Sequence, residues 1–431
     1  MLRLLFSPSL FFGEAFVKWN YRCPACGAEY EIEPTRYLCD ACSKSNVPGK
    51  PLYGVLECEW KDEKDNKTPG SGLELLGDYH SIPLPVEARF FPAIPVGKTP
   101  LWEPERLRAE MGFPRLFLKD DTCNPSGSFK DRASFLVAAF ARKWKIREIA
   151  LASTGNAASS MAAIGAAADL GITVFLPAAA PVAKRIQVLQ YGAELREVAG
   201  TYDQAFDESL AYSAATGVLS RNTAYNPLTI EGKKTVSFEI AADLAALGRG
   251  WTGNGSVGTV KQDSVPDHVF VPTGDGVIIA GVIRGFEDLI KLGETTRMPT
   301  VWAAQAEGSS AIARALDEDS RGIKPFERFV PSDTLADSIS VDVPRNGVYT
   351  LAKMKKYSGR AVVVSDAEIL EAQRYLSSRS GLFAEPSSAC AFAGFMKVRS
   401  QLDKKATVVV MLTGSGLKDI RNAARAVGSA V

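Results

Sequence analysis

The chain has 431 residues, of which 46% are hydrophobic and 23% are charged. These are ordinary values for a folded globular protein, and they exclude wholesale disorder. The 50 basic and 49 acidic side chains leave a formal net charge of +1, which argues against nucleic acid or an anionic membrane as a partner. Only two histidines are present, His80 and His268. A multi-histidine metal centre is therefore excluded, and an enzyme with this sequence would take most of its proton transfer from other groups.

The first 19 residues are rich in apolar side chains but do not have the pattern of a membrane span. Pro8 and Glu14 interrupt the apolar run, which stays below the roughly 18 residues that a transmembrane helix needs. The segment also lacks the small-residue cleavage site of a secretory signal peptide. We therefore expect a β-rich lead-in that packs on the rest of the protein, no membrane partner, and a cytoplasmic location.

Four of the seven cysteines form two closely spaced pairs. Cys23 and Cys26 make one pair, Cys39 and Cys42 make the other, and 12 residues separate them. Two CxxC turns at this spacing are typical of a tetrahedral zinc site, in which each turn presents two thiolates to one ion. Disulfides and a metal-free ribbon are the alternatives, although disulfides fit poorly in a chain with the other features of an intracellular protein. We expect a structural zinc ribbon rather than a nucleic-acid-binding one, because residues 1–60 contain no dense basic run.

Beyond the cysteines, the chain alternates short apolar runs with amphipathic patterns. Residues 61–75 are charged and then rich in Pro, Gly and Ser, which predicts a linker. The apolar runs predict strands at 148–153, 172–177, 268–273, 300–305, 361–365 and 406–413. Helical patterns lie at 157–170, 181–191, 203–214, 230–247, 366–378 and 387–398. Nearly continuous apolar strands that alternate with helices indicate an α/β protein with open, mostly parallel sheets. Residues 248–265 are rich in Gly and polar residues and predict a mobile surface insertion.

One lysine follows a loop of small residues at the start of a predicted helix. Lys130 lies within residues 121–134 (DTCNPSGSFKDRAS). The partial positive charge of a helix N-terminus disfavours the ammonium form and favours a nucleophilic amine. Taken alone, the same pattern also suits an ordinary surface lysine in a turn.

Three further segments come directly after predicted strands, where open α/β sheets bind ligands. Residues 153–157 (STGNA) offer hydroxyls, an amide and backbone N–H groups to an anion, although a simple helix N-cap has the same pattern. Residues 273–277 (TGDGV) suit a phosphate, but they do not match the GxGxxG dinucleotide motif, and Asp275 must point away from the anion or pair with a cation. Residues 413–419 (TGSGLKD) add hydroxyls and glycines, and a plain turn is the alternative.

Together and in this order, these segments resemble threonine synthase and its relatives, which are pyridoxal 5'-phosphate (PLP) enzymes of fold type II. The resemblance covers roughly residues 85–425. It is carried by PSGSFKDR at 125–132, STGNAASS at 153–160, NPLTIEGKKT at 226–235, PTGDGVIIAG at 272–281, AEPSSA at 384–389 and TGSGLKD at 413–419. The paired cysteines are similar to the short zinc-ribbon lead of many archaeal and bacterial members. The family implies a two-domain α/β fold with open, twisted, mostly parallel sheets behind that lead.

The resemblance also implies domain boundaries. Residues 1–60 would form the zinc-ribbon-like segment. Residues 61–123 and 220–431 would form the large PLP-binding domain, and residues 124–219 the small domain. A homodimer is expected by analogy with the family.

The resemblance implies a role for each motif residue. Lys130 would form the internal aldimine with PLP and carry the catalytic proton transfers, which agrees with the scarcity of histidine. Asn156 would hydrogen-bond the ring oxygen of PLP, and Thr413 would face its pyridine nitrogen. Ser153 and Thr154 would hold the substrate carboxylate. The cofactor phosphate would bind the loop made of Gly274, Asp275, Gly276, Val277 and Ile278.

The implied reaction converts O-phosphohomoserine and water to threonine and phosphate. Lys130 would remove the α proton, a β proton would follow, phosphate would leave from the γ carbon, and water would add at the β carbon. A hydroxyl such as that of Thr413 leaves the pyridine nitrogen neutral, which favours elimination and replacement over transamination.

One departure from the family bears on the substrate. Members that act on O-phosphohomoserine usually carry an arginine two residues after Asn-Pro, and this chain has Thr229 there. Loss of a bidentate phosphate donor lowers the expected affinity for a phosphorylated substrate. Lys233 and Lys234 are candidates to compensate, and we expect Lys233 to contact the substrate. The alternatives are a threonine or serine dehydratase-like enzyme, a cysteate-synthase-like enzyme that replaces a β substituent, and an inactive scaffold with a zinc ribbon.

Overall fold

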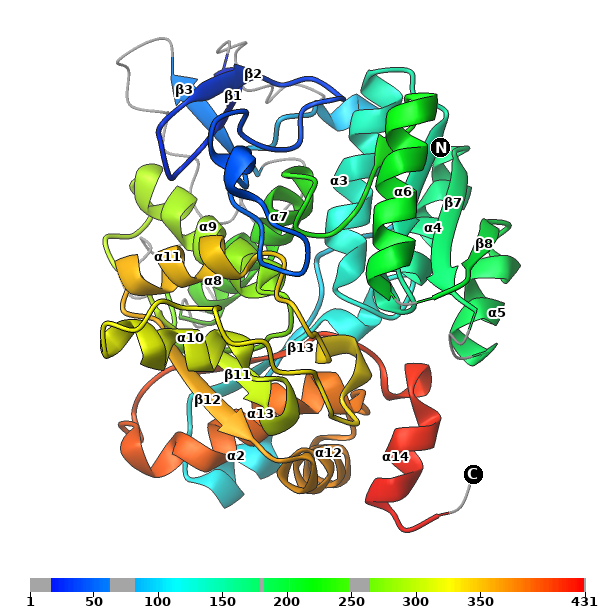
Figure 1. Cartoon of the computed structure of the whole chain (residues 1–431). Helices are drawn as coiled ribbons and strands as arrows, with labels where there is room; N and C mark the ends of the chain where they lie inside the picture. The colour runs from blue at the N-terminus through cyan, green and yellow to red at the C-terminus, as the bar shows by residue number, and fades with distance from the viewer. Residues whose placement is uncertain (1–16, 63–81, 179–181, 201, 249–263, 430–431) are drawn as a thin grey trace, which may run out of the picture.

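The computed structural model describes residues 17–62, 82–178, 182–200, 202–248 and 264–429, which form three sheets with helices around them (Figure 1). Most of the predicted lead-in at 1–19, most of the predicted linker at 61–75 and most of the insertion at 248–265 lie outside the described residues. No helix of the described part is long and apolar enough to span a membrane.

The largest sheet has six strands in the order β12-β11-β10-β13-β5-β4. All its neighbouring strands run parallel except β4, which is antiparallel to β5. Its members are β4 (Leu101–Trp102), β5 (Leu116–Asp120), β10 (His268–Pro272), β11 (Thr300–Ala306), β12 (Arg360–Val364) and β13 (Val408–Leu412).

Both faces of this sheet are covered, which explains why its strands read as continuous apolar runs. On β10, Phe270 packs with the layer of α12 (Asp366–Ser380) and α13 (Pro386–Val398). Its neighbours Val269 and Val271 pack in the opposite layer with α8 (Thr235–Gly248) and α9 (Val277–Lys291). Alternate residues of one strand therefore belong to two separate hydrophobic cores.

The second sheet has four parallel strands in the order β8-β7-β6-β9. These are β6 (Glu148–Ala152), β7 (Gly171–Pro177), β8 (Glu194–Val198) and β9 (Leu219–Ser220). Its helices are α3 (Lys130–Lys143), α4 (Asn156–Ala168), α5 (Val182–Gln190) and α6 (Tyr202–Thr216), drawn in cyan to green in Figure 1. Ile149 and Leu151 of β6 pack with α3 and α4, whereas Ala150 and Ala152 pack with α6.

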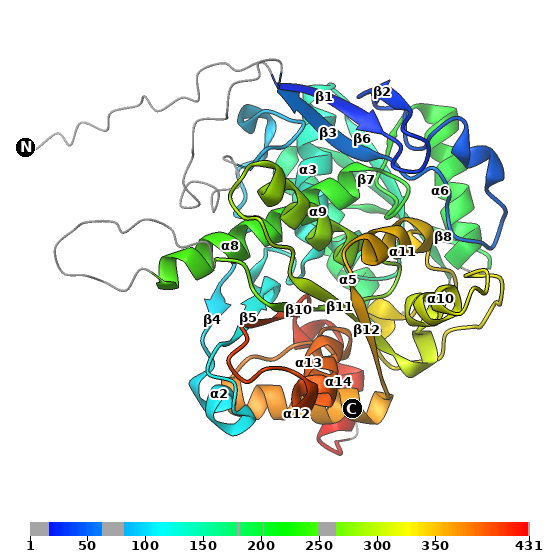
Figure 2. The same ribbon diagram turned by 90° about the vertical axis from the view of Figure 1, so that its left-hand side faces the viewer.

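The third sheet is a small antiparallel one made of β1 (Val17–Arg22), β2 (Glu29–Glu31) and β3 (Glu57–Asp62). It lies over α9, on the side away from β11 and β12, in both Figure 1 and Figure 2. Arg284 of α9 donates to the backbone oxygen of Cys58 at 3.1 Å, and Tyr349 of α11 (Gly347–Lys356) donates to the Glu57 carboxylate at 2.6 Å. Hydrogen bonds to β3 therefore join this sheet to two helices of the main body.

All six predicted strands are confirmed, with ends within about two residues of those observed. The predicted helix at 230–247 is wrong in detail, because the chain forms α7 (Leu228–Glu231), a 3-10 turn at Gly232–Lys234, and then α8. The remaining helices are α2 (Glu105–Met111), α10 (Ala311–Ser320) and α14 (Ile420–Ala426). The strands β4, β5, β8 and β9 were not predicted from the sequence.

Candidate active site

Lys130 is the first residue of α3, and the loop before it is held by a buried carboxylate. Asp131 accepts hydrogen bonds from the backbone N–H of Ser126 at 2.7 Å and from its hydroxyl at 2.6 Å. Gly127 has a φ of +78°, a left-handed conformation that a side chain would strain. Lys418 donates to the backbone oxygen of Ser126 at 2.7 Å. The loop therefore has a defined path, and the Lys130 side chain begins at a fixed point.

The segment that contains Thr413 pairs directly with this loop. The N–H of Phe129 donates to the Thr413 oxygen at 2.9 Å, and the N–H of Ser415 donates to the Gly127 oxygen at 3.0 Å. The Thr413 N–H itself donates to the Ser388 hydroxyl at 2.7 Å. The turn after β13 and the turn before α3 are consequently parts of one unit.

Asn156 lies at the start of α4 and contacts a carboxylate from a distant part of the chain. Its side-chain amide donates to Glu385 at 2.8 Å and to the Ser338 hydroxyl at 3.3 Å. Glu385 is buried, and its N–H donates to the oxygen of Gly414, next to Thr413. Glu385 thus links the two segments, because its side chain contacts Asn156 and its backbone contacts the residue after Thr413. Glu385 belongs to one of the family motifs, but it was not predicted to be a site residue.

The turn between β10 and α9 carries Gly274, Asp275, Gly276, Val277 and Ile278. Gly276 has a φ of +92°, and a Cβ there would lie 2.3 Å from the Thr350 hydroxyl, so only glycine fits. The Asp275 carboxylate accepts the N–H of Val277 at 3.0 Å and so turns back onto the helix N-terminus. One of the N–H groups expected to bind a phosphate is therefore already used by a side chain, whereas other first-turn N–H groups of α9 have no intrahelical acceptor.

Three cations lie around Asp275, and their positions explain its presence. Burial lowers the pKa of Lys130, Arg221 lowers it further, and Asp275 and Glu385 oppose the shift. Burial also lowers the pKa of Lys233 well below its usual range, with a further contribution from Lys130 and opposition from Asp275. Lys233 is 0% exposed, and its amine has no hydrogen-bond partner among the described residues. Asp275 thus supplies negative charge to a group of buried cations.

Ser153 and Thr154, the other residues predicted to bind substrate, lie just before α4. The Ser153 hydroxyl accepts the N–H groups of Gly155 at 3.1 Å and Ala158 at 3.2 Å, so it caps α4. Thr154 is partly exposed beside it.

Thr229 is 0% exposed, and its hydroxyl donates to the Asn226 oxygen at 2.7 Å. The threonine that replaces the expected arginine therefore uses its donor within its own turn.

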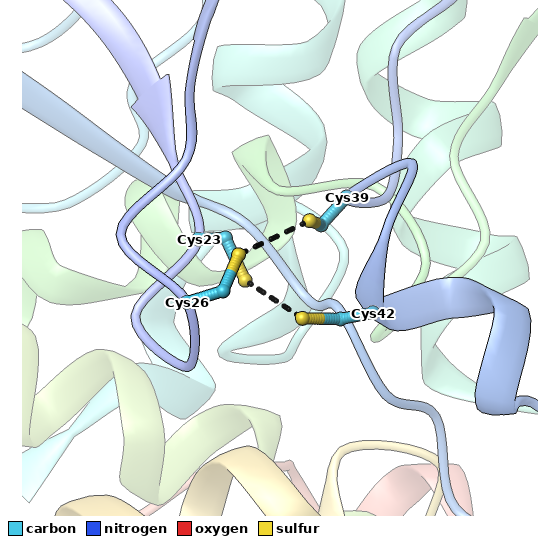
Figure 3. A group of neighbouring side chains, drawn as sticks. All are labelled: Cys23, Cys26, Cys39 and Cys42. Atoms are coloured by element: carbon cyan, nitrogen blue, oxygen red, sulfur yellow. Dashed lines mark hydrogen bonds between the residues drawn. The ribbon is translucent and has the colours of Figure 1, made fainter.

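The four paired cysteines lie together in the N-terminal segment (Figure 3). Their sulfur atoms all lie within 4.8 Å of one another, with Cys23 and Cys42 at 3.8 Å and Cys26 and Cys39 at 3.6 Å. Zinc–sulfur bonds of about 2.3 Å in a tetrahedron place sulfurs about 3.8 Å apart, whereas a disulfide has an S–S bond of about 2.05 Å. The cluster therefore suits a metal ion and contains no disulfide.

Comparison with protein families gives a match to the model described as "Pyridoxal-phosphate dependent enzyme" over residues 93–414. The chain belongs to this family. It is 30% identical to a threonine synthase of Methanocaldococcus jannaschii over 94% of both chains. It is 31% identical to a threonine synthase of Methanosarcina acetivorans over 93% of this chain and 92% of the relative.

Among solved structures, the processed form of threonine deaminase isoform 2 from Solanum lycopersicum has the same fold, with a TM-score of 0.60 and 21% sequence identity. The match covers 77% of this chain and 87% of the deaminase chain. The predicted resemblance to the threonine synthase family and the predicted fold class are thus confirmed.

The residues of this PLP-family site fit a phosphorylated aldehyde cofactor. An amine with a lowered pKa begins α3, which suits condensation with an aldehyde. The α9 N-terminus and the unpartnered Lys233 amine suit an anion close by. The hydroxyl of Thr413 forms no hydrogen bond with the described residues, which leaves it able to meet a ring nitrogen. These features agree with the family assignment on physical grounds.

A second buried cation of the PLP-family site was not predicted from the sequence. Arg221 follows β9 and is 0% exposed, and its Nη2 atom has no hydrogen-bond partner among the described residues. None of the family motifs contains it. The only sequence signal was its place directly after a short strand, and that strand was itself not predicted.

Proposed function

We propose that this PLP-dependent enzyme converts O-phosphohomoserine and water to threonine and phosphate. The observation that carries the proposal is the similarity to two threonine synthases over more than nine-tenths of both chains. Two buried cations with unpartnered donor atoms, Arg221 and Lys233, support it, because the substrate carries a phosphate. The overall reaction breaks the bond between Cγ and the phosphate oxygen and forms a C–O bond from water at Cβ.

Lys130 is the residue that we propose for proton transfer. PLP, when bound, withdraws electrons from the substrate's Cα and so makes its proton acidic. The uncharged Nζ of Lys130 then accepts that proton and later returns it. A lowered pKa increases the uncharged fraction of this amine, which is the form that acts as a base.

The remaining site residues bind the substrate and hold the cofactor in its orientation. Ser153 and Thr154 hold the substrate carboxylate, with help from the N-terminus of α4. The loop from Gly274 through Asp275, Gly276 and Val277 to Ile278 holds the cofactor phosphate through its N–H groups. Asn156 and Thr413 orient the cofactor ring.

Lys233 supplies positive charge to a bound phosphate. Its buried amine has no other partner among the described residues, so an anion here would also satisfy its hydrogen-bonding groups. Because Lys233 packs close to Gly281 of α9, we assign it to the cofactor phosphate, which the N-terminus of that helix would bind.

The finer properties of the protein are also proposals. The four cysteines bind one zinc ion that stabilises the N-terminal segment. The large domain comprises residues 61–123 and 220–431, and the small domain residues 124–219. The enzyme acts in the cytoplasm as a homodimer on a phosphorylated amino acid, without nucleic acid or membrane partners.

A second candidate is elimination from threonine or serine without a phosphate leaving group. The observation that favours it is Thr229, which is buried and hydrogen-bonded to its own turn instead of presenting a cation. A dehydratase would release 2-oxobutyrate from threonine, and a cysteate-synthase-like enzyme would exchange a β substituent. These products differ from threonine and phosphate, so a substrate panel separates the candidates.

The test uses PLP-saturated enzyme and measures phosphate, 2-oxobutyrate and amino-acid products together. We expect phosphate and threonine in equal amounts from O-phosphohomoserine. No phosphate release would contradict the proposal. Lys130→Ala should lose both activity and the visible absorbance of bound PLP, and a protein that never shows this absorbance would be an inactive scaffold.

A further inference from the structure

Arg221 is a buried guanidinium without a carboxylate partner among the described residues, which is an unusual state for a charged side chain. Its Nε donates to the Ser134 hydroxyl at 3.3 Å and its Nη1 to the Thr223 hydroxyl at 2.6 Å. Its Nη2 has no hydrogen-bond partner, and Arg221 forms no salt bridge within the described part of the chain. The side chain is thus oriented by two hydroxyls while one face of the guanidinium keeps its donors unused.

Arg132, a second wholly buried arginine of this protein, has the ion pairs expected of a structural residue. Arg132 is also 0% exposed, and it pairs with Asp121 at 2.6 Å and with Glu239 at 2.5 Å. These carboxylates raise the pKa of Arg132 well above its usual value, whereas burial lowers the pKa of Arg221 to about 10. Arg132 thus pairs with two carboxylates, whereas Arg221 pairs with no carboxylate of the described residues.

The position of Arg221 places it beside Lys130 on the side of the four-stranded sheet. Ser134, which accepts from Arg221, lies four residues after Lys130 on α3 and therefore on the same face, about 6 Å further along the helix. The N–H of Arg221 donates to the oxygen of Ala150 in β6, the strand that leads into Ser153. Arg221 is therefore close to both the amine and the proposed carboxylate site.

The cofactor phosphate has a different proposed location. It would bind the N-terminus of α9, and Lys233 packs close to Gly281 of that helix. Arg221 instead contacts α3, β6 and Thr223. An anion at Arg221 would therefore be a second one, separate from the cofactor's.

We propose that Arg221 is a specificity-determining residue that binds the distal phosphate of the substrate. This inference rests on the proposed function, and it assigns to Arg221 the task that an arginine at position 229 would otherwise have. In O-phosphohomoserine, two methylene carbons and an ester oxygen separate the phosphate from Cα, so the phosphate lies beside the reacting centre. A bound phosphate would satisfy the open Nη2 donor and supply the missing counter-charge.

The test compares holoenzyme variants Arg221→Gln and Arg221→Lys by spectral titration of the bound PLP. Arg221→Gln should weaken O-phosphohomoserine binding at least about tenfold and leave threonine binding within about twofold, because threonine has no distal phosphate. Arg221→Lys should have an affinity for O-phosphohomoserine between those of the wild-type enzyme and Arg221→Gln. Arg196→Gln, which removes a partly exposed arginine of the same sheet, is the matched control and should change neither affinity. Equal weakening for both amino acids would overturn the proposal, since it would indicate a general structural role.

Two further measurements separate this inference from its alternatives. If the PLP affinity of Arg221→Gln falls while the ratio of the two amino-acid affinities stays constant, Arg221 binds the cofactor phosphate and the proposal is wrong. Titration of holoenzyme with inorganic phosphate gives a readout that does not depend on turnover. Phosphate binding that needs Arg221 supports the anion site even if O-phosphohomoserine is not converted, and phosphate binding unchanged by Arg221→Gln overturns it.

Discussion

The hydroxyl of Tyr37 accepts the backbone N–H of Ser220 at 2.8 Å. Tyr37 lies two residues before Cys39 of the cysteine cluster, and Ser220 directly precedes Arg221. The Tyr37 ring also stacks on Tyr225, with ring centroids 4.8 Å apart. The N-terminal segment therefore supports the turn that carries Arg221.

Replacement of Tyr37 by Phe should test this support. The variant keeps the ring and its stack on Tyr225 but leaves the Ser220 N–H without its acceptor. An unsatisfied buried donor costs about 1–3 kcal/mol, so the free energy of unfolding in urea should fall by a similar amount. We also expect weaker binding of O-phosphohomoserine, because the turn at Arg221 loses an anchor.

Tyr53→Phe is the matched control for that experiment. Tyr53 belongs to the same N-terminal segment but is 39% exposed, and its hydroxyl forms no hydrogen bond with the described residues. Its loss should change neither stability nor binding beyond experimental error. A Tyr37→Phe variant as stable as Tyr53→Phe would show that the contact with Ser220 has no energetic weight.

Removal of the metal should affect both the N-terminal segment and the active site. The sulfur geometry suits one zinc ion, so purified protein should contain one zinc per chain by elemental analysis. Cys39→Ser should lose the zinc and unfold residues near the cluster, since metal binding and local folding are coupled. Because Tyr37 is close by, affinity for O-phosphohomoserine should fall as well.

Cys123→Ser provides the comparison for the metal experiment. Cys123 is exposed and lies outside the cluster. This variant should retain full zinc content and stability. Zinc-free protein with unchanged stability and binding would contradict the structural role of the metal.

Those features that have a local signature could be predicted from the sequence. Continuous apolar runs indicated the strands with two covered faces, such as β10 and β13, and the motif around Lys130 indicated the family. The strand β8 was missed, because its residues Glu194–Val198 are mostly polar at the edge of a sheet. The division into domains at 123/124 and 219/220 stays a prediction.

The site contained features that no local pattern could predict. Arg221 and Glu385 become part of it only through contacts with residues far along the chain, namely Ser134 and Asn156. A sequence pattern shows that an arginine is present but not that it lacks a carboxylate partner. Burial without a counter-ion is a property of the tertiary structure, and it is what distinguishes Arg221 from Arg132.

Charges that face Lys130 should shift its titration in opposite directions. Asp275 and Glu385 raise its pKa, whereas burial and Arg221 lower it. Asp275→Asn should therefore lower the pKa of Lys130 further, and Arg221→Gln should raise it. Only the uncharged amine condenses with the PLP aldehyde, so the pH of half-maximal reconstitution should move down in the first variant and up in the second. Shifts in the same direction would contradict this electrostatic arrangement.

Two adjacent buried lysines offer the sharpest test of the charge distribution. Lys233 and Lys234 are both 0% exposed, but Lys234 pairs with Glu231 and with Asp288, the latter at 2.6 Å. Lys234→Met would leave Glu231 without its paired cation and Asp288 with Arg284 alone, which should cost about 3–5 kcal/mol of unfolding free energy. Lys233→Met removes a charge that has no partner among the described residues, and it should stabilise PLP-free protein at pH 7 by about 1–3 kcal/mol.

The pH dependence of the Lys233→Met difference follows from the direction of the shift. Burial lowers the folded-state pKa of Lys233, so unfolded wild-type protein binds more protons between that pKa and the usual lysine value near 10.4. Wild-type stability therefore gains from rising pH in this interval, and the advantage of Lys233→Met should narrow toward pH 10. Urea unfolding of wild-type protein and of Lys233→Met, each at pH 7 and at pH 10, measures this difference in stability at the two pH values. A constant difference would mean that the folded-state pKa of Lys233 is not lowered, as it would be if the ammonium had an anionic partner. In the PLP-bound protein the advantage should shrink at pH 7 as well, because a bound phosphate gives the Lys233 ammonium the counter-charge that it otherwise lacks.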